Sequence, residues 1–178
     1  MQETRRREFL KTATLAATAG LVARCAGQDR SARSNASPSV MGLTVNPLER
    51  VRFGLIGVGE RGSVHTDLLC RIEGAQIMAI SDPHEEVLDR AMGIVEQHGR
   101  PAPQRIAGGE YGYRQMLDRD DIDAVLISTP WRWHAPMAIE AMESGKHAFV
   151  EVPMASTVEE CWQLVDTAER TQKNCMMM

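Results

Sequence analysis

Three glycines near residue 60 have the spacing of a phosphate-binding loop. Gly57, Gly59 and Gly62 form the pattern G-x-G-x-x-G. In this pattern the first glycine permits a tight turn, the second lets the backbone approach a pyrophosphate, and the third lets a helix pack against a strand. The pattern alone is weak evidence, but here it follows the apolar run 51–56 and opens a helical pattern. The helix would direct unpaired N–H groups and the positive end of its dipole at phosphates.

A carboxylate follows at the position where a dinucleotide site needs one. Asp82 ends a second apolar run, twenty residues after Gly62, and a carboxylate there accepts hydrogen bonds from ribose hydroxyls. It would also repel a 2′-phosphate, and no arginine is adjacent to it in the sequence. These signals together predict binding of NAD rather than NADP. The alternative is a structural turn in which Asp82 only caps a helix.

Two further polar segments follow apolar runs, where ligands of a parallel sheet are expected. The first contains two tryptophans and a histidine within four residues, at Trp131, Arg132, Trp133 and His134. Its rings suit stacking on a cofactor or hydrogen bonding to it, and the alternative is an apolar contact at a helix start. The second begins with Glu151, directly after the run 148–150. That carboxylate suits a ribose or a substrate, and the alternative is an exposed cap.

The elements that would position these residues alternate between strand and helix. Apolar runs and helical periodicity predict strands at 51–56, 75–80, 106–107, 123–129 and 148–150, with another beginning at 174, and helices at 61–72, 83–98, 113–117, 133–144 and 157–170. Thr157 followed by Glu160 is a capping box that marks the start of the last helix. The alternation predicts an α/β fold, a Rossmann-type doubly wound parallel sheet in a single domain, with helices on both faces.

Composition and charge exclude several classes of protein. The chain is 43% hydrophobic and 25% charged, which is ordinary for a globular domain. Residues 1–40 carry seven lysines and arginines against three acidic residues, whereas 41–178 carry thirteen against twenty-one. An acidic main part argues against nucleic-acid binding. We expect no metal site, and the cysteines at 25, 70, 161 and 175 are interpreted as buried thiols.

The basic head has the features of an export signal. Arg6 and Arg7 precede twelve uncharged residues, 12–23, which are too few to span a bilayer and resemble a twin-arginine signal. We expect a signal at 1–36, a linker at 37–50, and a periplasmic or cell-surface location. A disordered basic tail is the alternative. Cys25 suggests a lipid anchor, but Arg24 before it is wrong for that site.

Residues 51–178 resemble the N-terminal domain of the Gfo/Idh/MocA oxidoreductases. More narrowly they resemble glycoside hydrolase family 109, the NAD-dependent α-N-acetylgalactosaminidases. The stretches that carry the resemblance are 57–62, 80–82, 128–134, 151–153 and 159–162. The resemblance implies NAD contacts at Glu60, Arg61, Gly62, Asp82, Trp131, Arg132, Trp133, His134, Glu151 and Val152.

One position separates the two branches. The oxidoreductases usually carry Glu-Lys-Pro, and the lysine works near the hydride-transfer site, whereas this chain has Val152. The glycosidases share the replacement, so it favours them over an ordinary sugar dehydrogenase. By resemblance, the activity is hydrolysis of terminal α-N-acetylgalactosamine from glycans by transient oxidation at C3, elimination, water addition and re-reduction.

The resemblance also predicts what this chain lacks. The family continues into a C-terminal substrate domain, which is expected to hold the catalytic residues and any oligomer contact. None of those residues can be mapped to this sequence, so we expect the chain alone to be inactive. A periplasmic NAD(P)-dependent sugar oxidoreductase and a non-catalytic NAD-binding module are the alternative functions.

Overall fold

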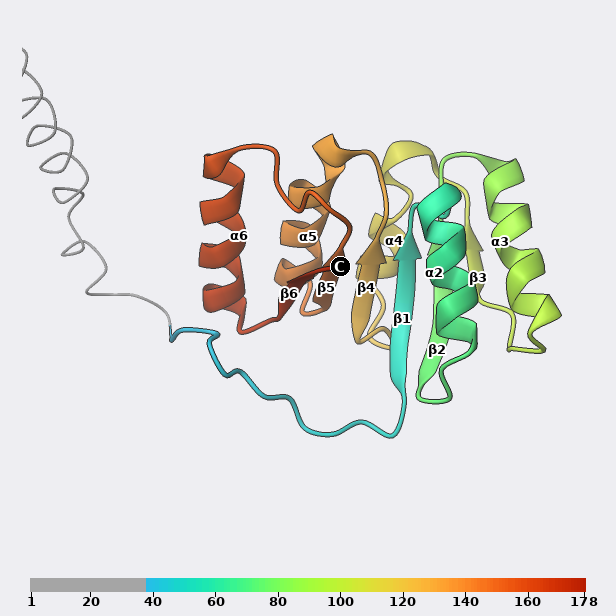
Figure 1. The fold of residues 1–178 in the computed structure, drawn as a ribbon, viewed down its shortest axis with the longest axis horizontal. Helices are drawn as coiled ribbons and strands as arrows, with labels where there is room; N and C mark the ends of the chain where they lie inside the picture. The colour runs from blue at the N-terminus through green and yellow to red at the C-terminus, as the bar shows by residue number, and fades with distance from the viewer. Residues whose placement is uncertain (1–37) are drawn as a thin grey trace, which may run out of the picture. The chain divides into compact units, whose positions relative to one another are not determined.

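The computed structural model describes residues 38–178, so the predicted export signal and Cys25 lie outside the described residues. Within residues 38–178, six strands form one sheet in the order β3-β2-β1-β4-β5-β6 (Figure 1). Each neighbouring pair is parallel. The strands are β1 (Val51–Ile56), β2 (Ala75–Ser81), β3 (Gln104–Ile106), β4 (Ala124–Ile127), β5 (His147–Val150) and β6 (Cys175–Met177). This is the doubly wound order of dinucleotide-binding sheets, and the predicted fold class is confirmed.

Helices connect the strands and cover the sheet. The α-helices are α2 (Glu60–Cys70), α3 (Glu85–Gln97), α4 (Arg114–Leu117), α5 (His134–Glu143) and α6 (Val158–Thr171). Two short 3-10 helices, η2 (Gly109–Tyr111) and η3 (Trp131–Trp133), lie in the loops before α4 and α5. Because crossovers between parallel strands are right-handed, helices that follow the two halves of the sheet pack on opposite faces (Figure 1).

The core consists of two clusters, one on each face of the sheet. Leu55 and Ile80 pack with α2 and α3, whereas Ile56 and Val125 pack with α4, α5 and α6. Neighbouring strand residues therefore enter different clusters, because side chains alternate across a strand. Burial of each such side chain is worth about 1.5–3 kcal/mol, so both faces stabilise the sheet that carries the strand ends.

Helix α2 is amphipathic in sequence but only partly buried. The apolar residues of the predicted helix 61–72 include Val64, Leu68, Leu69 and Ile72. Leu69 lies in the core, whereas Val64, Leu68 and Ile72 are 46%, 49% and 52% exposed. The periodicity therefore predicted the helix correctly, but most of these apolar side chains remain about half exposed.

Helix α3 begins later than predicted. The sequence favoured a start at Pro83, but α3 begins at Glu85 and its N-cap residue is His84. The reason lies in Asp82, whose Oδ1 accepts a hydrogen bond from the His84 N–H at 3.0 Å. This Asx turn keeps Asp82 and Pro83 outside the helix and leaves the carboxylate at the end of β2.

Helix α6 begins with the predicted capping box. The Thr157 hydroxyl accepts a hydrogen bond from the Glu160 N–H at 3.1 Å, and the Glu160 carboxylate accepts from the Thr157 N–H at 3.2 Å. Two N–H groups at the start of the helix are thereby satisfied.

Replacing Thr157 with alanine is expected to destabilise the domain by about 1 kcal/mol, the usual cost of an N-cap. Urea unfolding followed by circular dichroism measures this, and Thr171→Ala serves as the control at the other end of α6. Equal stability of wild type and Thr157→Ala would show that the cap contributes nothing.

The cysteines correct one prediction. Cys70 is buried and Cys175 is partly buried, but Cys161 is exposed on α6. The three are free thiols, so the expectation that all of them are buried is wrong for Cys161. Among residues 38–178, no helix is long and apolar enough to cross a membrane.

Candidate functional site

The turn after β1 requires glycine at two of its three glycine positions. Gly57 has a φ of +79°, and a Cβ there would lie 2.8 Å from the Ser128 carbonyl oxygen. A Cβ on Gly62 would overlap the Gly57 carbonyl oxygen. These glycines let β1, α2 and the end of β4 approach one another, as the sequence pattern predicts.

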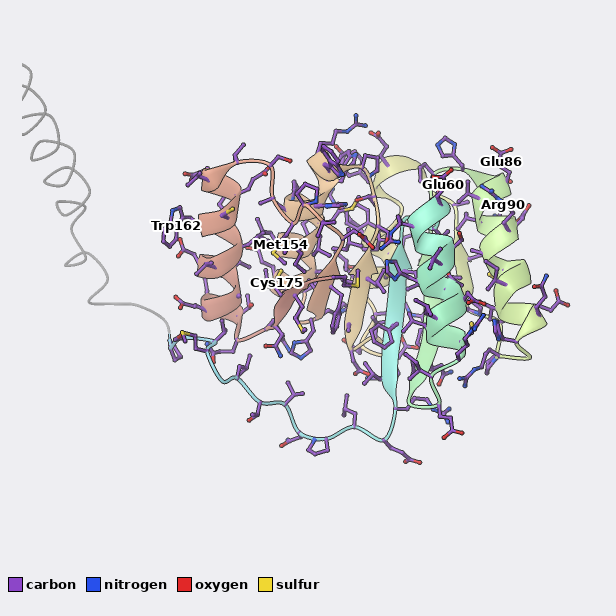
Figure 2. All side chains as sticks on the ribbon, in the orientation of Figure 1. Glu60, Glu86, Arg90, Met154, Trp162 and Cys175 are labelled. Atoms are coloured by element: carbon purple, nitrogen blue, oxygen red, sulfur yellow. The ribbon has the colours of Figure 1, made fainter. Side chains whose placement is uncertain are left out.

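The third glycine faces open space. A Cβ on Gly59 would meet no atom within 4 Å. Gly59 is the N-cap residue of α2, and no side chain caps the helix. The first N–H groups of α2 are therefore left for a ligand, and a helix N-terminus of this kind favours phosphate. Figure 2 shows Glu60 at this end of α2, on the side of the sheet where the strands end.

Asp82 is held rigidly at the end of β2. It is 7% exposed, and its Oδ2 accepts a hydrogen bond from the Val58 N–H at 3.0 Å while Oδ1 accepts from His84. Each carboxylate oxygen can accept a second bond. Asp82 thus fixes the glycine turn and keeps acceptor capacity for ribose hydroxyls, so its structural role leaves the predicted ligand contact open.

These residues surround an open cleft of about 290 Å³ at the carboxyl ends of β1, β2 and β4. The cleft lies where the strand order reverses between β1 and β4, which is the switch point at which open α/β sheets bind ligands. Its lining residues are Gly57, Gly59, Asp82, Pro83, His84, Glu110, Ser128, Thr129, Pro130, Arg132, Trp133 and Met137.

A polar atom in the cleft wall has no partner within the described protein. The Oγ of Ser128 is buried and makes no hydrogen bond to the described residues. Buried hydroxyls are nearly always bonded, so this oxygen suits a ligand group in the cleft. Ser128 lies in the stretch 128–134 that carries the family resemblance, but the sequence analysis gave its hydroxyl no role. The available signal was its place near the end of the predicted strand 123–129.

Two loops that precede α4 and α5 also contribute to the cleft wall. The Tyr111 and Trp133 rings meet edge to face with centroids 5.5 Å apart, and Arg132 Nη2 lies 3.1 Å from Glu110 Oε1. The sequence analysis missed Glu110 and Tyr111, because only the fold brings η2 beside η3. The sequence shows no arginine adjacent to Asp82, whereas Arg132, one of the expected NAD contacts, lines the same cleft and pairs with Glu110.

The remaining residues of the 131–134 segment differ in their surroundings. Trp131 is 66% exposed and does not line the cleft. His134 is buried, and its Nδ1 and Nε2 lie 2.7 Å from the carbonyl oxygens of Pro153 and Thr129. In this arrangement neither ring nitrogen is available to a cofactor. His134 instead joins the loops that follow β4 and β5.

The β5 end carries an ionic cluster rather than a free carboxylate. Glu151 Oε1 accepts hydrogen bonds from Arg61 Nη2 at 2.8 Å and Nε at 3.1 Å, and lies 2.6 Å from His65 Nε2. These bonds, from His65 first and then Arg61, hold the pKa of Glu151 below its ordinary value despite the opposing effect of burial. The alternative of an exposed cap is therefore wrong, since Glu151 is 6% exposed. Val152, beside it, is 52% exposed.

The sequence analysis did not predict the contact between His65 and Glu151. The two residues are 86 positions apart, so no local pattern connects them. Across residues 38–178, no group of three or more histidine, cysteine, aspartate or glutamate side chains is arranged to hold a metal ion.

The residues present fit NAD. The open N-terminus of α2 and Gly59 suit a pyrophosphate, Asp82 suits a ribose, and the unpartnered Ser128 hydroxyl suits a polar ligand atom. When bound, NAD supplies a hydride acceptor, and NADH a hydride donor. The fold and this cleft define a dinucleotide-binding Rossmann domain.

Comparison with known protein families identifies the family. Residues 51–178 match the family described as oxidoreductases with an NAD-binding Rossmann fold (Gfo/Idh/MocA). The chain therefore belongs to this family, and its cofactor is NAD.

Curated relatives match the whole chain. A glycosyl hydrolase family 109 protein of Shewanella baltica is 57% identical over 183 residues, covering 100% of this chain and 40% of the relative. An α-N-acetylgalactosaminidase of Shewanella oneidensis is 55% identical with the same coverage. These matches confirm the resemblance to family 109. The chain spans about 40% of the length of these relatives.

A solved structure matches the domain. The WlbA dehydrogenase of Chromobacterium violaceum, in complex with NADH and UDP-GlcNAcA, is 26% identical with a TM-score of 0.64. The match covers 76% of this chain and 37% of that protein. The match shows that the two proteins share the fold of this domain.

Proposed function

We propose that the protein to which this domain belongs hydrolyses terminal α-N-acetylgalactosamine from glycans. The observation that carries the proposal is Val152, a half-exposed apolar side chain directly after the ionised Glu151 at the β5 end. The wider family usually places a lysine at this position. Valine cannot act as an acid, a base or a cation, so the end of β5 is poorly suited to a net dehydrogenation. Relatives that are 55–57% identical to this chain and are named as glycosidases support the same conclusion.

The proposed reaction has no net redox change. The sugar is oxidised at C3, the aglycone leaves by elimination, water adds, and C3 is reduced again. Within this chain, α2 and Gly59 bind phosphate, Asp82 binds ribose, and Glu151 presents a fixed anion at the β5 end. We assign no acid or base to residues 51–178, and propose that the groups that move protons on the sugar lie outside them.

We also propose that the protein is exported from the cytoplasm. The Arg6-Arg7 head suits the twin-arginine route, which carries folded proteins with their cofactors. An enzyme that regenerates NAD in each turnover can keep it bound outside the cytoplasm. We therefore propose a periplasmic or cell-surface location, which fractionation of cells expressing the protein with and without Arg6→Lys and Arg7→Lys tests directly.

The assay uses 4-nitrophenyl α-N-acetylgalactosaminide, with 4-nitrophenol and NADH followed together. The assay is run on residues 1–178 and, where the reading frame continues past the codon for Met178, on the complete product. We expect the complete product to release 4-nitrophenol without accumulating NADH. We expect residues 1–178 alone to release no 4-nitrophenol. Accumulation of NADH from free sugar without release of 4-nitrophenol would instead favour a sugar oxidoreductase. Tight NAD binding without either activity would favour a non-catalytic module.

A further inference from the structure

Glu151 is held from one side by two residues of the same helix. Arg61 and His65 lie on α2, four positions apart, so both side chains face one direction. Both contact Oε1 of Glu151, with His65 at 2.6 Å and Arg61 at 2.8 Å. The Glu151 side chain is 8% exposed and that of His65 13%, whereas Arg61 is 66% exposed. His65 is therefore the sheltered donor of the two.

The second carboxylate oxygen is much less satisfied. Within residues 38–178, Oε2 of Glu151 accepts only from the N–H of Val152, at 3.3 Å. An ionised carboxylate can accept about four hydrogen bonds, and a sheltered one that lacks donors is costly. With Oε1 fixed by α2, Oε2 is the oxygen left to accept from a ligand at the β5 end.

The site already described is fixed to the same helix. The N-terminus of α2 begins at Glu60, next to Gly59, so the helix that lines the phosphate end also carries Arg61 and His65, which hold Glu151. The bond between His65 and Glu151 therefore links the phosphate end of the site to the β5 end. A ligand that spans both, as a dinucleotide does, depends on that link.

We propose that His65 is a positioning residue of the NAD site, holding Glu151 so that its second carboxylate oxygen, Oε2, faces the cofactor. The proposal rests on NAD as the cofactor but not on the glycosidase activity. His65 itself need not touch NAD. It acts through Glu151, because an imidazole N–H fixes the carboxylate rotamer and favours its ionised form.

The test compares variants of the full chain by ¹⁵N NMR titration with NAD, which also detects weak binding. His65→Leu is expected to lower the affinity for NAD about tenfold, because one charge-assisted hydrogen bond is lost. His65→Gln, which keeps an N–H donor, is expected to bind within about threefold of wild type. His98→Leu is the matched control, because His98 pairs with Asp67 of the same helix at 2.8 Å and lies outside the cleft.

A pH series separates positioning from mere packing. Loss of the hydrogen bond from His65 lets the pKa of Glu151 rise toward its ordinary value. The Glu151 carboxylate must be ionised to accept from NAD. As the pH is lowered, His65→Leu is therefore expected to lose NAD binding at a higher pH than wild type does. Equal pH profiles, or equal affinities of the His65→Leu and His98→Leu variants, would overturn the proposal.

A second measurement does not need NAD or a folded His65→Leu variant. The ring ¹⁵N chemical shifts of His65 are compared by NMR between wild type and Glu151→Gln at one pH. If the Glu151 carboxylate accepts from the imidazole, the Nε2 signal of His65 shifts in the variant, and unchanged ring signals would contradict the contact. If NAD shifts no amide of the wild-type site, the NAD assignment fails and the role of His65 fails with it. Absence of glycosidase activity alone leaves both standing.

Discussion

Replacing Gly59 with alanine is expected to weaken NAD binding by at least about a hundredfold while changing stability by less than about 1 kcal/mol. A Cβ at Gly59 meets no protein atom within 4 Å, so the folded protein accommodates it. The same methyl group would stand in front of the open N-terminus of α2, where the backbone must approach the pyrophosphate. NMR titration gives the affinity, and thermal unfolding gives the stability.

Gly62→Ala is the informative comparison. Its Cβ would overlap the Gly57 carbonyl oxygen, so this variant is expected to lose about 1–3 kcal/mol of stability through overpacking together with NAD binding. Unaltered NAD affinity of Gly59→Ala would mean that phosphates do not approach the glycine turn. A Gly62→Ala variant as stable as wild type would mean that α2 and β1 are not packed as described.

Replacing Asp82 with asparagine is expected to reduce NAD affinity about tenfold to a hundredfold and to narrow the preference for NAD over NADP. The amide retains one acceptor oxygen, so the variant cannot accept from both Val58 and His84, whose N–H groups now bond the carboxylate. Stability should fall by about 1–3 kcal/mol, because the N–H of Val58 or of His84 loses its acceptor. Removal of the charge also removes the repulsion of a 2′-phosphate.

Asp89→Asn is the control for this substitution. Asp89 lies on α3 and pairs with Arg105 at 3.1 Å, with 71% of its side chain exposed, so its loss should change stability by less than about 1 kcal/mol. Titrations with NAD and with NADP are run on both variants. If Asp82→Asn binds NAD as tightly as Asp89→Asn does, Asp82 is only a structural cap.

The sheet could be predicted because its strands are short apolar runs with clear ends. The run 51–56 stops at Gly57, and β1 is Val51–Ile56 as expected. Predictions were less accurate where a side chain competes with the backbone pattern. Asp82 binds the N–H of His84 and delays α3, and periodicity could not show that Val64 and Leu68 of α2 would remain exposed.

The candidate site also has one part that the sequence predicts and one part that it does not. The glycine turn and Asp82 are local features, so their spacing was sufficient to predict them. His65 with Glu151, and Glu110 with Arg132, are pairs separated by 86 and 22 positions. Only the order of the strands brings such residues together, because loops that follow different strands meet at one edge of the sheet. His134 is a residue type suited to a cofactor contact, but its ring instead bonds the backbone of the two loops that follow β4 and β5.

The central claim is that the cleft at the β1, β2 and β4 ends binds NAD. Amide chemical shifts of the ¹⁵N-labelled chain, recorded during titration with NAD, test it most directly because they locate even weak binding. We predict saturable shifts at Gly59, Asp82 and Ser128, with smaller shifts on addition of NADP. Shifts confined to other surfaces, such as the apolar groove between α6 and β6 lined by Met154 and Met177, or no shifts at all, would contradict it.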